Sequence, residues 1–298
     1  MSPSTRSASS DRALLALAAA MTVIEALGGL ALGSMSLIAD GAHMATHAAT
    51  LGLIAFAWHY SSGRLVAPRF AFGPGKIGAL ALFGVAILIG VLAAVVMAES
   101  ATRLIGLPLE AIDSLAIGIA LAAVVATIVI SPSLRGHLNK SAAVSADDAH
   151  GPALPHARPA PITVMRDLST SVLALAALLA STWLGWPWTD PLAALFGSLL
   201  VLRWTYQTAR DAAAMLLDIS SDDVAERIRS RLTGPDTRVT DLHVWRIGPC
   251  AHAVVMRAST ELSLGELRER LQPIDGIVHL TIERLPTWPA GGSTFRSD

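Results

Sequence analysis

The chain has very little cysteine and few charged residues. Cys250 is its one cysteine, which excludes an intrachain disulfide framework and a cysteine-rich zinc module. Histidine and carboxylate side chains are therefore left as the strong metal ligands. Only 15% of the 298 residues are charged, and the net charge of −1 gives no indication of nucleic-acid binding. Instead, 53% of residues are hydrophobic and the mean hydropathy is +0.54, which is typical of several membrane spans.

Six apolar runs are long enough to cross a lipid bilayer, which takes roughly 20 helical residues each. They lie near residues 12–33, 37–60, 77–105, 112–131, 162–185 and 188–217. Arginine and lysine gather in alternate connections, so the positive-inside rule places both termini in the cytoplasm. We predict a membrane domain over residues 12–217. Residues 1–11 are expected to be disordered, and the polar, proline-containing segment 132–161 to be a flexible cytoplasmic loop.

The second span carries Asp40, His43 and His47 in its first half. A charged residue at the centre of a membrane helix costs at least ~2.5 kcal/mol on insertion scales, so such residues usually have a partner or a task. The two histidines are four residues apart and share one helix face, with Asp40 on the same stripe. One small cation could contact both rings, since neutral imidazole binds Zn²⁺ and suits Co, Ni, Fe and Cu. The alternatives are hydrogen bonds to neighbouring helices and, less favoured, haem ligation.

The fifth span repeats this spacing with Thr163 and Asp167. If the two spans pack together, His43, His47 and Asp167 supply two nitrogens and a carboxylate. The fourth tetrahedral position is left to Thr163, to Asp40 or to water. Such a site without thiolate favours Zn²⁺, Co²⁺, Ni²⁺ or Fe²⁺ over Cu(I), and its few oxygens argue against Ca²⁺. Because histidine titrates near pH ~6.5, protons compete with the metal.

The composition changes after Leu217, and residues 218–286 are charged enough for a small soluble domain. Its hydrophobic periodicity predicts the order helix, strand, strand, helix, strand (αββαβ). Such a small domain is near the lower limit for independent stability, so we expect packing against a second copy. His243, His252 and His279 alternate with apolar residues on these strands and are either surface side chains or a secondary, regulatory metal site. Residues 287–298 are expected to be disordered.

Four stretches together resemble the cation diffusion facilitator family. They are SLIADGAHMATHA in the second span, PRFAFGPGK before the third, WTDPLA at the start of the sixth and TDLHVWRIGP in the C-terminal region. The likeness is closest to the bacterial divalent-metal efflux branch associated with cobalt and nickel. It implies a homodimer in the bacterial inner membrane, with six-transmembrane-helix subunits and a ferredoxin-like α+β cytoplasmic domain. Family members export a divalent cation in exchange for protons.

The resemblance maps the transport site onto His43, His47, Thr163 and Asp167. This chain departs from the family pattern because the fifth-span pair is usually His-x-x-x-Asp, and a hydroxyl is a poorer ligand than imidazole. The ion is then held by three strong ligands plus water or a loop histidine, or metal preference has changed, or transport is lost. We predict an efflux transporter, not an enzyme, that works by alternating access without a tightly bound cofactor. The alternative is a transport-silent or regulatory metal-binding subunit that partners an active homologue.

Overall fold

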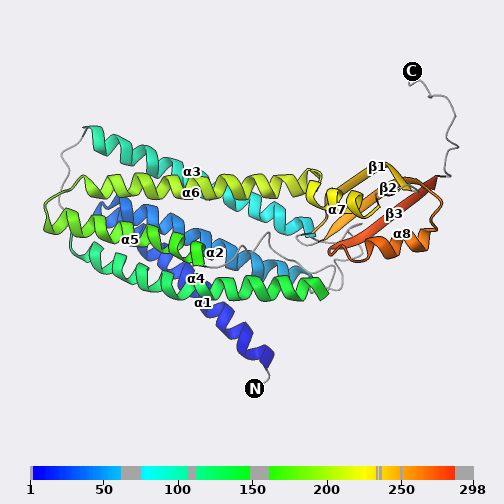
Figure 1. Ribbon diagram of the computed structural model, residues 1–298. Coiled ribbons are helices and arrows are strands. Elements are labelled where there is room, and N and C mark those ends of the chain that lie inside the picture. Colours follow the sequence, from blue (N-terminus) through cyan, green and yellow to red (C-terminus); the bar gives the residue numbers. More distant parts are fainter. Residues whose placement is uncertain are drawn as a thin grey trace.

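Six long helices lie side by side and lead into a small sheet (Figure 1). They are α1 (Pro3–Leu32), α2 (Met35–Ser61), α3 (Gly75–Gly106), α4 (Leu115–Asp147), α5 (Pro161–Trp183) and α6 (Thr189–Leu216). The computed structural model describes residues 3–61, 75–106, 112–147, 161–232, 234, 237–248 and 251–285; within them, the side chains of 3–12, 54–61, 134–147 and 161–167 are not described. We call the end of the bundle beside the sheet proximal and the opposite end distal.

Each long helix contains most of one predicted apolar run, because these runs are rich in alanine and leucine, which are strong helix formers. Tight turns at the distal end join α1 to α2 and α5 to α6. Each turn contains a glycine with positive φ, namely Gly33 at +71° and Gly185 at +67°, a conformation that other residues rarely adopt. Among the described residues, Ala13–Leu32, Gly75–Gly106 and Leu115–Ser133 are long and apolar enough to cross a membrane.

Small residues let the long helices approach closely. A Cβ on Gly41 of α2 would lie 3.1 Å from the backbone nitrogen of Ala26 and 3.2 Å from the Cβ of Glu25, both in α1. Similarly, a Cβ on Gly90 of α3 would lie 3.1 Å from the hydroxyl of Thr205 in α6. Close backbone approach at small residues is the usual way in which membrane helices pack, because lipid gives no hydrophobic drive between them.

Two predicted segments are wrong in part. Helix α1 begins at Pro3, so residues 3–11 are helical instead of disordered. Helix α4 continues through Pro132 to Asp147, so the first half of the predicted loop 132–161 is helical as well. Lengthening an existing helix adds a hydrogen bond per residue without a new nucleus, which offsets the bond that Pro132 cannot make. The rest of the loop, residues 148–160 with His150 and His156, lies outside the described residues.

The C-terminal part has the predicted order of elements. These are α7 (Asp222–Leu232), β1 (Thr237–Arg246), β2 (His252–Thr260), α8 (Leu264–Leu271) and β3 (Ile277–Leu285). The sheet order is β1-β2-β3, with β1 and β2 antiparallel and β2 and β3 parallel. One face packs with α7 and α8 around a core that includes Ile228, Met256 and Leu267. A capping box between Ser263 and Glu266 starts α8.

The small sheet is joined to the bundle at the proximal end of α3. The Nζ of Lys76 lies 2.6 Å and 2.8 Å from the two carboxylate oxygens of Asp218, which follows α6. Beside it, the carbonyl of Ile247 in the β1–β2 turn lies directly against the position that a Cβ on Gly75 would take. The chain therefore needs glycine at the start of α3 for this turn to dock there.

Candidate functional site

The predicted histidine pair of α2 is in place. The ring centroids of His43 and His47 are 4.9 Å apart with an interplanar angle of 85°. The side chain of His47 is buried and that of His43 is half-buried. The two imidazoles thus share one helix face inside the bundle, as their four-residue spacing predicts. An ion on that face would meet nitrogen ligands that water hardly reaches.

Asp40 fixes the neighbouring turn of α2 against α5. It is 2% exposed, and its Oδ1 accepts a hydrogen bond of 3.1 Å from the Ser171 hydroxyl of α5. Ser171 in turn lies 3.1 Å from the Thr127 hydroxyl of α4. A chain of hydroxyl groups therefore connects α4 and α5 to the stripe of α2 that carries the histidines. Helices α2 and α5 therefore pack together, which is the condition for a site shared between the second and fifth spans.

The other two predicted ligands, Thr163 and Asp167, belong to the first turns of α5, where the backbone is described and the side chains are not. Among the described residues, no group of three or more His, Cys, Asp and Glu side chains is placed to hold a metal ion. Among the described side chains, the structure therefore brings the two histidines together and adds no third ligand.

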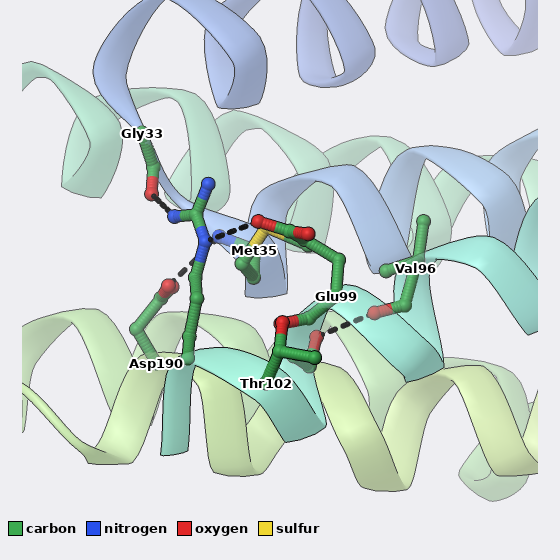
Figure 2. A network of polar contacts seen from close by, with 8 residues as sticks. Gly33, Met35, Val96, Glu99, Thr102 and Asp190 are labelled. Atoms are coloured by element: carbon green, nitrogen blue, oxygen red, sulfur yellow. Dashed lines mark hydrogen bonds and ion pairs between the residues drawn. The ribbon is translucent and has the colours of Figure 1, made fainter. Parts of the chain in front are cut away.

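A second polar cluster, at the distal end of the bundle, holds the start of α2 (Figure 2). Asp190, in the first turn of α6, is 2% exposed and accepts hydrogen bonds from the backbone nitrogens of Met35 at 2.8 Å and Ser36 at 3.2 Å. It also accepts bonds from the hydroxyls of Ser34 at 2.7 Å and Ser36 at 2.5 Å. The Ser34 hydroxyl accepts from the backbone nitrogen of Leu37 at 3.2 Å. The free N–H groups in the first turn of α2, which a helix leaves without partners of its own, are thus satisfied.

Helix α3 adds a cation to this distal cluster. The Nη1 of Arg103 donates a hydrogen bond of 2.8 Å to the carbonyl of Gly33, and its Nε donates one of 3.1 Å to Glu99. Figure 2 shows the α1–α2 turn beside the neighbouring ends of α3 and α6. The distal cluster, which we define as Ser34, Ser36, Asp190 and Arg103, therefore joins three parts of the bundle.

The three C-terminal histidines do not converge on a common point in the chain. His243 and His279 lie on the exposed sheet face, on the outer strands β1 and β3, and pair in register with Val255 and Ala253. His243 contacts Asp241 at 3.1 Å. His252 begins β2 at a position that alternates with those of the other two histidines, so it does not share their sheet face. Burial lowers the pKa of the His252 imidazole. The negative charge of Asp223 raises this pKa, and the positive charge of Arg246 lowers it. The predicted secondary metal site thus has no assembled ligand set among the described residues of a subunit.

Comparison with known proteins decides the family. Residues 12–217 match the profile of the cation efflux transmembrane domain. This chain belongs to the cation efflux family. It is therefore an integral membrane protein and a divalent metal cation efflux transporter, as predicted, and not an enzyme.

Several named relatives of this cation efflux protein cover most of its length. The zinc transporter ZitB of Escherichia coli (strain K12) is 31% identical over 234 residues, which are 77% of this chain and 70% of ZitB. The metal cation efflux system protein CzcD of Cupriavidus metallidurans is 30% identical over 286 residues, 90% of this chain and 84% of CzcD. The cadmium, cobalt and zinc/H(+)-K(+) antiporter of Bacillus subtilis (strain 168) is 26% identical over 279 residues, 88% of this chain and 83% of the relative.

The sequence reasoning missed one ionisable residue of this cation efflux protein. Glu25 lies in α1, its side chain is 0% exposed, and neither carboxylate oxygen has a hydrogen-bond partner among the described residues. The signal was present, because Glu25 is the one ionisable residue in the apolar stretch Ala13–Leu32. The rule that drew attention to Asp40 and the histidines of α2 applies equally to Glu25.

Proposed function

We propose that this cation efflux protein exports Zn²⁺ from the cytoplasm in exchange for protons, and that the ion binds between α2 and α5. His43, His47 and Asp167 are the strong ligands in this proposal. The observation that carries it is the contact between the two imidazole rings, on a helix face that Asp40 holds against α5.

Helical register supports the inclusion of Asp167. Helix α2 runs from the distal to the proximal end and α5 runs the opposite way, since the distal turns precede α2 and follow α5. Asp40 and Ser171 lie at the same height along the bundle axis, because they are hydrogen-bonded to each other. From that level, steps of three to four residues towards the proximal end lead to His43 and His47 on α2. On α5, two steps of four residues, about 6 Å each, lead from Ser171 to positions 167 and 163.

The donor set favours zinc. Two imidazoles and a carboxylate are common ligands of Zn²⁺, with a fourth position open to water or, in this chain, to the Thr163 hydroxyl. Zinc is also the one metal that the names of the Escherichia coli and Bacillus subtilis relatives share. Co²⁺ and Cd²⁺, which the second name adds, are the next candidates, ahead of Ni²⁺ and Fe²⁺. We assign Asp40 to holding α5 against α2 and not to the ion, because its carboxylate already accepts the Ser171 bond.

Exchange for protons follows from the ligands. Imidazole binds metal only when it is neutral and has a reference pKa near ~6.5, so protons displace the metal at modestly acidic pH. Alternating access to the two membrane sides would then load metal at the neutral cytoplasmic face and release it at the more acidic face.

Topology and assembly complete the proposal. All six long helices span the bacterial inner membrane, residues 218–286 form a ferredoxin-like domain beside the proximal end, and both termini are cytoplasmic. The chain acts as a homodimer. The order of the C-terminal elements and the charge pattern of the connections support these assignments.

Purified protein in liposomes tests the metal site. Zn²⁺, Co²⁺, Cd²⁺, Ni²⁺ and Fe²⁺ are each supplied to vesicles that contain a pH-sensitive dye, and metal-driven proton flux is recorded. Zinc is expected to drive flux in the unaltered protein and in Asp211→Ala, a control at an exposed position of α6. His47→Ala and Asp167→Ala should abolish the flux.

Two results would speak against the proposal. Normal flux in His47→Ala and Asp167→Ala would remove the site from α2 and α5. Absence of flux with every metal in the unaltered protein, together with metal binding and recovery of flux in Thr163→His, would favour the regulatory alternative.

A further inference from the structure

Glu25 is a buried carboxyl group that the proposed metal site does not use. Asp40 has a hydroxyl donor from α5 and Asp190 has four hydrogen bonds from the α1–α2 turn. Glu25 has no hydrogen-bond partner among the described residues, although its side chain is fully buried. A carboxylate without donors is very costly away from water, so the group needs a cation to neutralise it.

The position of Glu25 directs it towards α2. A Cβ on Gly41 would lie 3.2 Å from the Cβ of Glu25, so the two residues meet where the backbones of α1 and α2 come closest. The nearby hydroxyl of Thr22 donates to the carbonyl of Ala18 at 2.9 Å and is therefore engaged within α1. The α1–α2 interface thus places a carboxyl group, with few polar groups around it, beside the turn of α2 that precedes the histidines.

The charged surroundings of Glu25 are simple. The helices packed against α1 are α2 and α4. From α2, the negative charge of Asp40 acts on Glu25, and the histidine pair follows on the same helix. The stretch of α4 from Leu115 to Ser133 contains no ionisable residue. Asp40 adjoins Gly41, which meets Glu25 across the α1–α2 interface. Two buried carboxylates on facing turns cannot both ionise cheaply, so one of them must be neutralised.

A proton suits this position better than a metal ion. A metal would need several ligands, and among the described residues no cluster of three or more ligand side chains includes Glu25. A proton needs only one carboxylate oxygen. We propose that Glu25 is a second proton-binding group of the exchanger, separate from the histidine pair, which binds one proton in each transport cycle and releases it on the other side of the membrane.

This inference rests on the proposed exchange of metal for protons and specifies which groups carry the protons. A proton bound to one oxygen of Glu25 converts the carboxylate to the neutral acid, and its release restores the carboxylate, so no other reactant is required. The histidines would lose and regain protons through direct competition with the metal. Glu25 would do so because the α1–α2 interface becomes accessible from one side of the membrane and then from the other.

The test compares protons and zinc in the same vesicles. Zinc uptake and proton release are measured together for the unaltered protein and for Glu25→Gln, Glu25→Asp and Glu99→Gln. Glutamine matches the size of the protonated acid but cannot release the proton. Glu99→Gln is the matched control, because Glu99 lies at the surface of α3 in an ion pair with Arg103.

Glu25→Gln is expected to move about one proton fewer per zinc ion, while Glu25→Asp and Glu99→Gln keep the ratio of the unaltered protein. An unchanged ratio in Glu25→Gln would overturn the inference and leave the metal site intact. If the unaltered protein moved no zinc, the proposed function would fail first. If Glu25→Gln removed only a dependence on K⁺, with protons unaffected, the bound cation would be potassium and the inference would again be wrong.

A variant that stops transport altogether still gives an answer by infrared spectroscopy. In metal-free protein, a change from high to low pH should produce the carbonyl band of a protonated buried carboxyl group. Asp40 is also buried and can contribute to this band, so its size is compared between variants: Glu25→Gln should lose the contribution of one carboxyl group, and Glu99→Gln should lose none. If the band were absent from the unaltered protein, or had the same size in Glu25→Gln, Glu25 would not be the proton carrier.

Discussion

Substitution of Asp190 by alanine is expected to destabilise the bundle strongly. The carboxylate accepts two backbone and two hydroxyl hydrogen bonds at the start of α2. Hydrogen bonds to charged groups contribute about 1.5–3 kcal/mol each, and they are not additive in one network. Loss of one partner from a buried charged network typically costs ~3–5 kcal/mol. We therefore expect a loss of this size for Asp190→Ala.

Thermal unfolding of detergent-solubilised protein measures the effect. For a chain of this size, roughly 2–4 °C is lost per kcal/mol, so Asp190→Ala should unfold about 10 °C below the unaltered protein. Asp190→Asn keeps one acceptor oxygen but turns an amide N–H₂ towards donors, and its loss should be intermediate. Asp211→Ala, an exposed control on the same helix, should change little. A melting temperature for Asp190→Ala within a degree or two of the control would refute the idea that this carboxylate holds α2 to α6.

Two further substitutions test the packing of α1 on α2 and the C-terminal part. Gly41→Ala should lower the free energy of unfolding by about 1–3 kcal/mol, because the new Cβ would lie 3.1 Å from α1 backbone. Gly78→Ala, where a Cβ would have open space, is the control and should not destabilise the protein. Equal melting temperatures of the two variants would contradict this. Burial lowers the pKa of folded His252 below its ordinary value of 6.5. The unfolded state then binds more protons, so stability is full above pH 6.5 and falls as the pH drops through 6.5 towards the folded pKa. His252→Gln should reduce that pH dependence in unfolding curves, and an identical dependence would remove His252 as its source.

Local patterns were enough to predict the helices and the histidine pair. The length of an apolar run indicates whether a helix can cross the membrane, and a four-residue spacing indicates that two side chains share a helix face. Both can be read from the sequence because each is a property of a single helix. The ends of the helices were less predictable. Helix α4 continues well beyond its apolar part and through Pro132, since hydropathy marks where a helix meets lipid and not where its hydrogen bonds stop.

Contacts between distant segments could not be predicted from such patterns. Asp190 and the Ser34 hydroxyl are 156 residues apart in the chain, and no local spacing indicates that one satisfies the other. The bond between Asp40 and Ser171 depends equally on how α2 and α5 happen to pack. Packing of the second span against the fifth could only be posed as a condition from the sequence. The condition is met because each span carries polar residues that need a partner away from lipid.

Among the described residues of the bundle, the buried carboxyl groups are Glu25, Asp40 and Asp190, and they differ in their hydrogen bonding. Asp190 accepts hydrogen bonds on both carboxylate oxygens, so the fold stabilises its negative charge. Asp40 accepts one on Oδ1 from Ser171, while its Oδ2 has no partner among the described residues, so its charge is stabilised in part. Their removal should therefore act first on stability. Glu25 has the same burial without donors among the described residues, so the fold gains nothing from its charge. Glutamine at position 25 should consequently leave the melting temperature unchanged or raise it. A large fall would instead make Glu25 a third structural acid, with a donor that the described side chains do not include.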